Sequence, residues 1–125
     1  MQMKASCLLV VVTLCQGVSD KPAMSLVVGQ TAALVADGIT TRQIIIQGGV
    51  EKNPVARVLI GERPTWGRMI PVGVVEVIGA FYLGQKMRHS NNRVIRRLWW
   101  VPQVLTIAGH SAAAIHNDRL LQRDR

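Results

Sequence analysis

Three long apolar runs limit what this chain can fold into. They cover about residues 23–46, 66–86 and 98–117, and arginine-rich and lysine-rich connectors separate them. Each run approaches the ~20 residues that a helix needs to cross the hydrocarbon core of a bilayer. Lipid offers no water to exposed backbone groups, so a run that crosses it must be helical. The sequence therefore predicts an all-α integral membrane fold with about three transmembrane helices.

The N-terminal segment differs from the rest of the chain and is typical of a secretory signal. Lys4 gives a positive start, residues 5–15 are apolar, and the small residue Ser19 offers a cleavage point. The apolar part is too short to span a bilayer comfortably. We expect residues 1–19 to be a signal peptide, or else an uncleaved anchor, and residues 20–125 to form a single three-helix membrane domain.

The formal net charge of +8 has to be interpreted together with these runs. In a water-soluble protein such a charge would suggest nucleic acid. Here the basic residues lie between the apolar runs, including a basic hinge after the second run. Trp66, Trp99 and Trp100 lie at run edges, where aromatic rings collect in bilayers. We therefore expect anionic lipid headgroups as the partner rather than nucleic acid, and the bacterial cytoplasmic membrane as the location.

The connector after the first run carries clear helix signals. Gly48 and Gly49 are expected to end the first helix, because glycine relieves the backbone of side-chain constraints. Asn53 is a favourable cap residue, and Pro54 suits the first position of a helix. These signals predict a short helix over residues 54–60. We expect this helix to lie on the membrane surface, with an ordinary polar connector as the alternative.

Each apolar run contains one ionisable residue well inside it: Asp37, Glu76 and His110. Counting ~1.5 Å per residue from the ends of the runs places all three at nearly the same depth. A charge that faces lipid costs at least ~2.5 kcal/mol, so we expect these side chains to point inward and pair. Other polar residues share the faces of these three: Gln30, Thr40, Thr41, Gln103, Thr106 and Asn117.

Three roles are open for this polar cluster. It can be a hydrogen-bonded knot that sets the register of the helices, or it can handle protons or ions. Asp37, Glu76 and His110 are also the candidate ligands for a divalent cation, although no cofactor is the simpler expectation. The HExxH, GxSxG, GxGxxG and P-loop patterns are absent from the sequence. An enzyme is therefore not the favoured class.

One pattern of the first run and its connector resembles a known family. The run D-x-x-T-T followed by G-x-E-x-N-P is similar to a family of small bacterial and archaeal membrane proteins catalogued only as a domain of unknown function. The matching residues are Asp37, Thr40, Thr41, Gly49, Glu51, Asn53 and Pro54. The resemblance implies about three spans and marks Glu51, Asn53 and Pro54 as a loop motif. It implies no activity.

Two functions follow from these features. Small residues of the second run, Gly73, Gly79, Ala80 and Gly84, allow a neighbouring helix to approach closely. They favour an accessory or structural component of a membrane complex, with other subunits or further copies as partners. The alternative is a module that handles ions, protons or a metal through Asp37, Glu76 and His110. A dry, mutually bonded cluster favours the first function, and a water-connected cluster favours the second.

Overall fold

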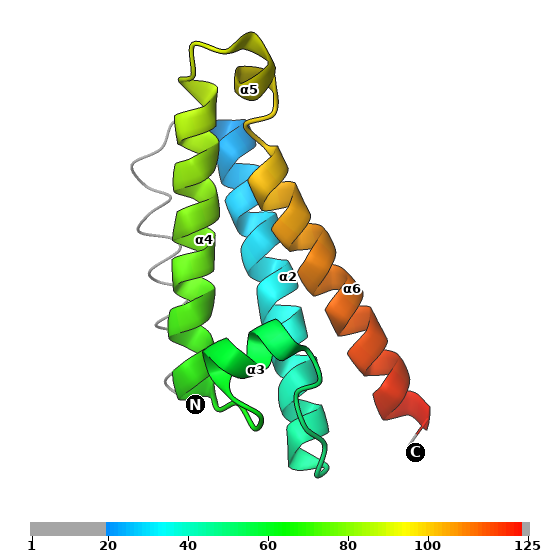
Figure 1. Ribbon diagram of the computed structural model, residues 1–125. Helices are drawn as coiled ribbons and strands as arrows, with labels where there is room; N and C mark the ends of the chain where they lie inside the picture. The colour runs from blue at the N-terminus through cyan, green and yellow to red at the C-terminus, as the bar shows by residue number, and fades with distance from the viewer. Residues whose placement is uncertain (1–19, 124–125) are drawn as a thin grey trace.

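The structure is a computed structural model that describes residues 20–123. This part of the chain is helical and contains no strand (Figure 1). The helices are α2 (Lys21–Ile46), α3 (Pro54–Ile60), α4 (Trp66–Arg88), α5 (Arg93–Arg97) and α6 (Val101–Arg123). The predicted signal segment lies outside the described residues.

The three long helices form a bundle in which α2 and α6 run in the same direction and α4 runs against them (Figure 1). Among the helix pairs, α2 and α6 have the most extensive contact. The short helices α3 and α5 lie at opposite ends of this bundle, which we call the α3 end and the α5 end. The helices α4 and α6 are close together at the α5 end and diverge towards the α3 end (Figure 1).

The ends of the helices follow from local chemistry. Asn53 Oδ1 accepts hydrogen bonds from the backbone N–H groups of Val55 at 3.0 Å and Ala56 at 3.4 Å, with Pro54 at the start of α3. Gly48, just after α2, has a φ of +90°, a backbone conformation that residues other than glycine rarely adopt. The predictions of a short helix over residues 54–60 and of a glycine break after the first long helix are therefore confirmed.

Of the three predicted spans, two correspond to helices that are long and apolar enough to cross a membrane, and the third does not. Among the described residues, α2 and α4 are long and apolar enough to cross a membrane. The 23-residue helix α6 is long enough but too polar. It carries a polar residue at every seventh position: Gln103, His110 and Asn117. The third helix also begins later than predicted, because residues 98–100 form a turn. The short helix α5 before this turn was not predicted, since only a basic hinge was expected there.

The interior of the bundle consists mostly of small residues and includes three polar side chains, whereas much of its exterior is apolar. The buried hydrophobic residues are Ala23, Val27, Ala33, Val77, Ala80 and Leu121, and the buried polar residues are Gln30, Thr41 and Gln103. Within the most apolar stretch of α2 only 28% of residues are buried, and in α4 only 22%. Val75 and Tyr82 of α4 are 71% and 65% exposed. So many exposed large apolar side chains are unlike the pattern expected for a helix bundle in water.

Helix α4 uses most of its small residues inside this chain. A Cβ atom on Gly73 would lie 2.7 Å from a methyl carbon of Leu34 in α2, and one on Gly84 would lie 2.7 Å from the carbonyl oxygen of Trp99. Ala80 is also buried. Only Gly79 of this group has open space at the Cβ position. The close approach predicted from these residues is thus made largely by α2 and by the segment leading into α6.

Candidate functional site

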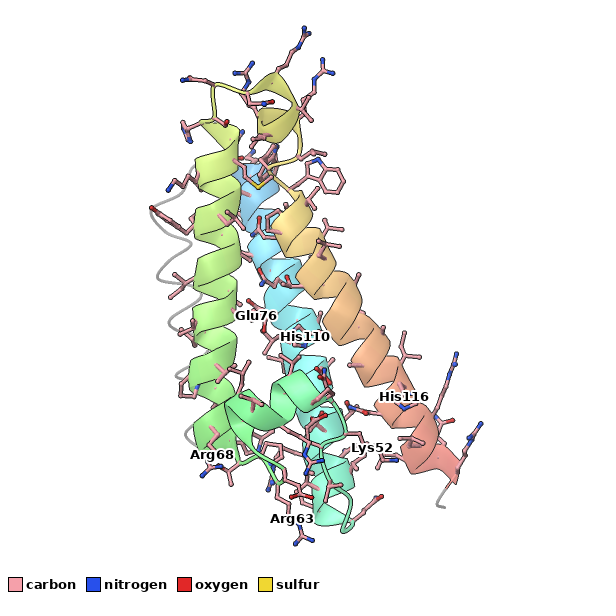
Figure 2. The ribbon with its side chains drawn as sticks, in the orientation of Figure 1. Lys52, Arg63, Arg68, Glu76, His110 and His116 are labelled. Atoms are coloured by element: carbon pink, nitrogen blue, oxygen red, sulfur yellow. The ribbon has the colours of Figure 1, made fainter. Side chains whose placement is uncertain are left out.

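His110 of α6 lies between Asp37 of α2 and Glu76 of α4. Its Nδ1 atom is 2.7 Å from Asp37 Oδ2, and its Nε2 atom is 3.0 Å from Glu76 Oε1. Figure 2 shows Glu76 and His110 near the middle of the bundle, between the diverging helices α4 and α6. The structure thus brings together the three ionisable residues that were expected to lie at one depth, one from each long helix.

The two contacts of the imidazole ring determine how many protons the cluster holds. Each contact joins a ring nitrogen to a carboxylate oxygen, so each needs a hydrogen atom. A neutral imidazole supplies only one. The second belongs either to an imidazolium between two carboxylates or to one protonated carboxyl group beside a neutral ring. Both arrangements give the cluster a net charge of −1.

Asp37 and Glu76 differ in the number of donors that they receive. Besides His110, Asp37 accepts hydrogen bonds at Oδ1 from the Thr41 hydroxyl at 3.3 Å and from Asn117 Nδ2 at 3.4 Å. Among the described residues, Glu76 accepts a hydrogen bond only from His110. Asp37 is therefore the more fully hydrogen-bonded of the two carboxyl groups, whereas the Oε2 atom of Glu76 has no hydrogen bond among the described residues.

The register of α2 against α6 explains why these side chains meet. Gln30 and Asp37 are seven residues apart in α2, as are Gln103, His110 and Asn117 in α6. A spacing of seven returns to the same face of a helix, and parallel helices pair such positions layer by layer. Asn117 completes one such layer, because its Nδ2 atom lies 3.1 Å from Thr41 Oγ1.

Not every predicted polar residue joins the cluster. Thr40 Oγ1 donates to backbone carbonyls of its own helix and accepts a long bond of 3.4 Å from Asn117. Thr106 Oγ1 donates to the carbonyl oxygen of Gln103 at 2.8 Å, which is a contact within α6. Gln103 is buried two turns before His110, and its Nε2 atom has no partner among the described residues. Thr106 and Gln103 therefore lie outside the cluster.

The loop motif has a structural role. Glu51 Oε1 accepts a hydrogen bond from the backbone N–H of Asn53 at 2.8 Å, and Asn53 in turn caps α3. The backbone N–H of Glu51 also donates to the carbonyl oxygen of Glu62 at 2.9 Å, which closes the loop around α3. Glu51, Asn53 and Pro54 thus shape the connector.

The cluster does not have the geometry of a metal centre. Within residues 20–123, no three side chains of the His, Cys, Asp and Glu types converge in a way that could hold a metal ion. The reason is the position of the ring: Asp37 and Glu76 bind to different nitrogens of His110, so the imidazole separates their oxygens. The three candidate ligands are neighbours, but they do not surround a common point.

A cavity of about 810 Å³ leads from the α3 end to the cluster. Asp37, Glu76 and His110 line its inner end, and Lys52 and His116, labelled in Figure 2, line it nearer the α3 end. Helices α2, α3, α4 and α6 supply the walls, which are largely apolar. A volume of this size is typical of sites for small organic ligands. Lys52 and His116 were not predicted from the sequence, because they are distant in sequence and border a common space only where α4 and α6 diverge.

Comparison with protein-family models, curated proteins and solved structures gave no match. The resemblance to a family of unknown function therefore stays a prediction.

The chemistry available to the site follows from its geometry. The side chains of Asp37, Glu76 and His110 are 19%, 33% and 23% exposed, and this exposure faces the cavity. The side chains of the cluster are hydrogen-bonded to one another, as expected for a structural role. They also border accessible space, as expected for an ion site. The cluster can therefore accept or release a proton, or neutralise a positive charge, without a prior rearrangement of its side chains.

Proposed function

We propose that this chain is a small integral membrane protein whose Asp37–His110–Glu76 cluster exchanges protons with one aqueous face through the cavity. The observation that carries the proposal is the position of His110. Both of its ring nitrogens bind carboxylates, at 2.7 and 3.0 Å, at the inner end of that cavity. Histidine is the side chain best suited to gain and lose a proton near neutral pH.

Two features support residence in a membrane, for which we propose the bacterial cytoplasmic membrane. Helices α2 and α4 are long and apolar enough to span it, and most of their apolar surface faces outward. Helix α6 is more polar, but its stripe of Gln103, His110 and Asn117 is turned towards α2 and α4. Polar groups that lie inside a bundle avoid the cost of facing lipid, and His110 and Asn117 are also hydrogen-bonded there. Helix α6 can therefore lie beside the two apolar helices.

An accessory role in a larger membrane complex is the second proposal. The small residues that favoured it are mostly occupied within the chain, since Gly73 packs on Leu34 and Gly84 on Trp99. What still favours it is the outward face of α4, where Val75, Ile78 and Tyr82 are exposed. Lipid satisfies this face equally well, so we place proton exchange first. Purification in mild detergent tests the accessory role, which predicts a stoichiometric partner.

The test of proton exchange measures the protonation of the ring nitrogens of His110. The chain has three histidines, so the double change His89→Gln with His116→Gln leaves His110 as the only one. We expect the ¹⁵N signals of its ring, in lipid nanodiscs, to respond to the pH of the solution. A ring that does not respond over the range in which imidazole and carboxyl groups titrate would contradict the proposal.

A pair of glycine variants tests the route. Gly109 lines the cavity, and a Cβ atom there meets nothing within 4 Å, so Gly109→Leu places a side chain in the open space. Gly79 has the same freedom but lies outside the cavity lining, so Gly79→Leu is the matched control. We expect slower exchange of the His110 ring protons with water in the first variant alone. Equal exchange in both variants would exclude the cavity as the route.

A further inference from the structure

The charges around the cavity favour a positively charged ligand. The charged and titratable groups of its lining are Asp37, Glu51, Lys52, Glu76, His110 and His116. Glu51 and Lys52 are adjacent and opposite in sign, so their charges offset each other. The cluster at the inner end keeps its net charge of −1 in either arrangement of its protons. A single positive charge therefore neutralises this end of the cavity.

Glu76 is the group at which such a charge would dock. Asp37 already receives three donors at its two oxygens. Glu76 receives one donor, at Oε1, and among residues 20–123 its Oε2 atom accepts no hydrogen bond. Its side chain is 33% exposed, the highest value in the cluster. The Oε2 atom of Glu76 is thus available to a ligand in the cavity.

The walls of the cavity select the kind of cation. A metal ion needs several oxygen or nitrogen ligands that converge on one point, and the described residues offer no such group. The walls are instead apolar, with Leu34, Val72 and Leu105 among them. Apolar walls with a few polar groups at one end are typical of sites for organic ligands. The occupant that matches both features is an apolar molecule with one positive charge.

We infer that the cavity binds a lipophilic organic cation, an ammonium or phosphonium with an apolar body, with its charge against Glu76. This inference rests on the proposed function, because the cation and the exchanged proton use the same negative charge. A proton added to the cluster brings its charge from −1 to 0 and removes the attraction. A cation that enters the neutral cluster therefore releases one proton, and the charge of the site is conserved.

The test uses tetraphenylphosphonium as the probe and the full chain in lipid nanodiscs. We expect calorimetry to detect saturable binding that weakens as protons are added, with release of a proton at low pH. Glu76→Gln should weaken binding by at least about tenfold. Glu62→Gln removes a carboxylate that pairs with Arg57 outside the cavity, so binding should be unchanged. A neutral molecule of similar body, triphenylphosphine oxide, should bind far more weakly.

A second variant separates loss of charge from loss of fold. Glu76→Asp keeps the negative charge, so it should bind the probe much more strongly than Glu76→Gln does. If Glu76→Gln binds like the unchanged chain, or if the cation and the neutral molecule bind equally, the inference is wrong. If the probe does not bind while His110 still responds to pH, the inference fails and proton exchange stands. If His110 also fails to respond, both fail.

Discussion

The two halves of the bundle bury polar residues in opposite ways. In the half towards the α5 end, Gln30 and Gln103 are 0% and 1% exposed, and both Gln30 amide atoms and Gln103 Nε2 lack partners among the described residues. In the half towards the α3 end, Asp37, Thr41 and Asn117 bind one another and face a cavity. The amide atoms of the two glutamines are thus enclosed without partners, whereas the side chains of the cluster are paired with one another and border a cavity.

The packing of α4 accounts for this contrast. At the α5 end Gly84 lets α4 come against the carbonyl oxygen of Trp99, and Arg88 pairs with Asp20 and lies over the Trp99 ring at 4.7 Å. At the α3 end α4 also contacts α3, and it diverges from α6 (Figure 1). Burial alone therefore does not mark a site. Partners and access distinguish the cluster from the two glutamines.

The largest effect on stability should come from breaking the cluster. Removing one member of a fully buried charged pair costs about 3–5 kcal/mol. These side chains are partly exposed, so we expect His110→Ala and Asp37→Asn each to lower the free energy of unfolding by about 2–3 kcal/mol. Residues in one network couple by about 0.5–3 kcal/mol, so the double variant should lose less than the sum. Unfolding in detergent measures this, with His116→Ala as the control. Additive losses would show that the two side chains do not interact.

In the half towards the α5 end, the face of α4 that packs against Trp99 should be more sensitive to added volume than its outer face. Gly84→Ala forces α4 away from the Trp99 carbonyl, because the new Cβ atom would lie 2.7 Å from that oxygen. We expect a loss of about 1–3 kcal/mol, as for other overpacked sites. Gly79→Ala meets open space and should be neutral or stabilising by up to about 1 kcal/mol, because alanine favours helix. Equal melting temperatures for the two variants would contradict close packing at Gly84.

The same kind of polar-to-apolar change should have opposite signs in the two halves. Gln30→Leu removes an amide that has no partner, so we expect a gain of about 1 kcal/mol in the free energy of unfolding. Thr41→Val removes the donor to Asp37 and a partner of Asn117, so we expect a loss of about 1 kcal/mol. Thermal unfolding of the two variants measures both signs. A loss for Gln30→Leu would mean that the buried amide is satisfied, for example by water.

The smallest effect concerns α3, where exposed positions should differ in accessibility rather than in stability. Val55 and Leu59 are 66% and 60% exposed and Arg57 is also exposed, so cysteine at any of them should leave the free energy of unfolding nearly unchanged. If α3 lies on the membrane surface, cysteines at Val55 and Leu59 should resist aqueous labelling in vesicles, and one at Arg57 should react. Equal labelling rates at the three positions would indicate a solvated loop.

The sequence by itself determined the features that depend on local chemistry and on distance along a helix. Asn53 and Pro54 start α3 wherever the rest of the chain lies, because the cap uses only neighbouring backbone groups. The common level of Asp37, Glu76 and His110 follows from the constant rise per residue. The shared face of Gln103, His110 and Asn117 in the third run follows from helical geometry in the same way, although the polar residues of this run make it less apolar than a predicted span.

The tertiary structure alone decided how far apart the helices lie and which way the side chains turn. It placed the His110 ring between the two carboxylates, so they do not converge on a metal, and it used Gly73 and Gly84 within the chain rather than for a partner. It also opened the cavity between α4 and α6. Helical rise fixes depth, but separation and rotation result from the packing of side chains that are distant in sequence.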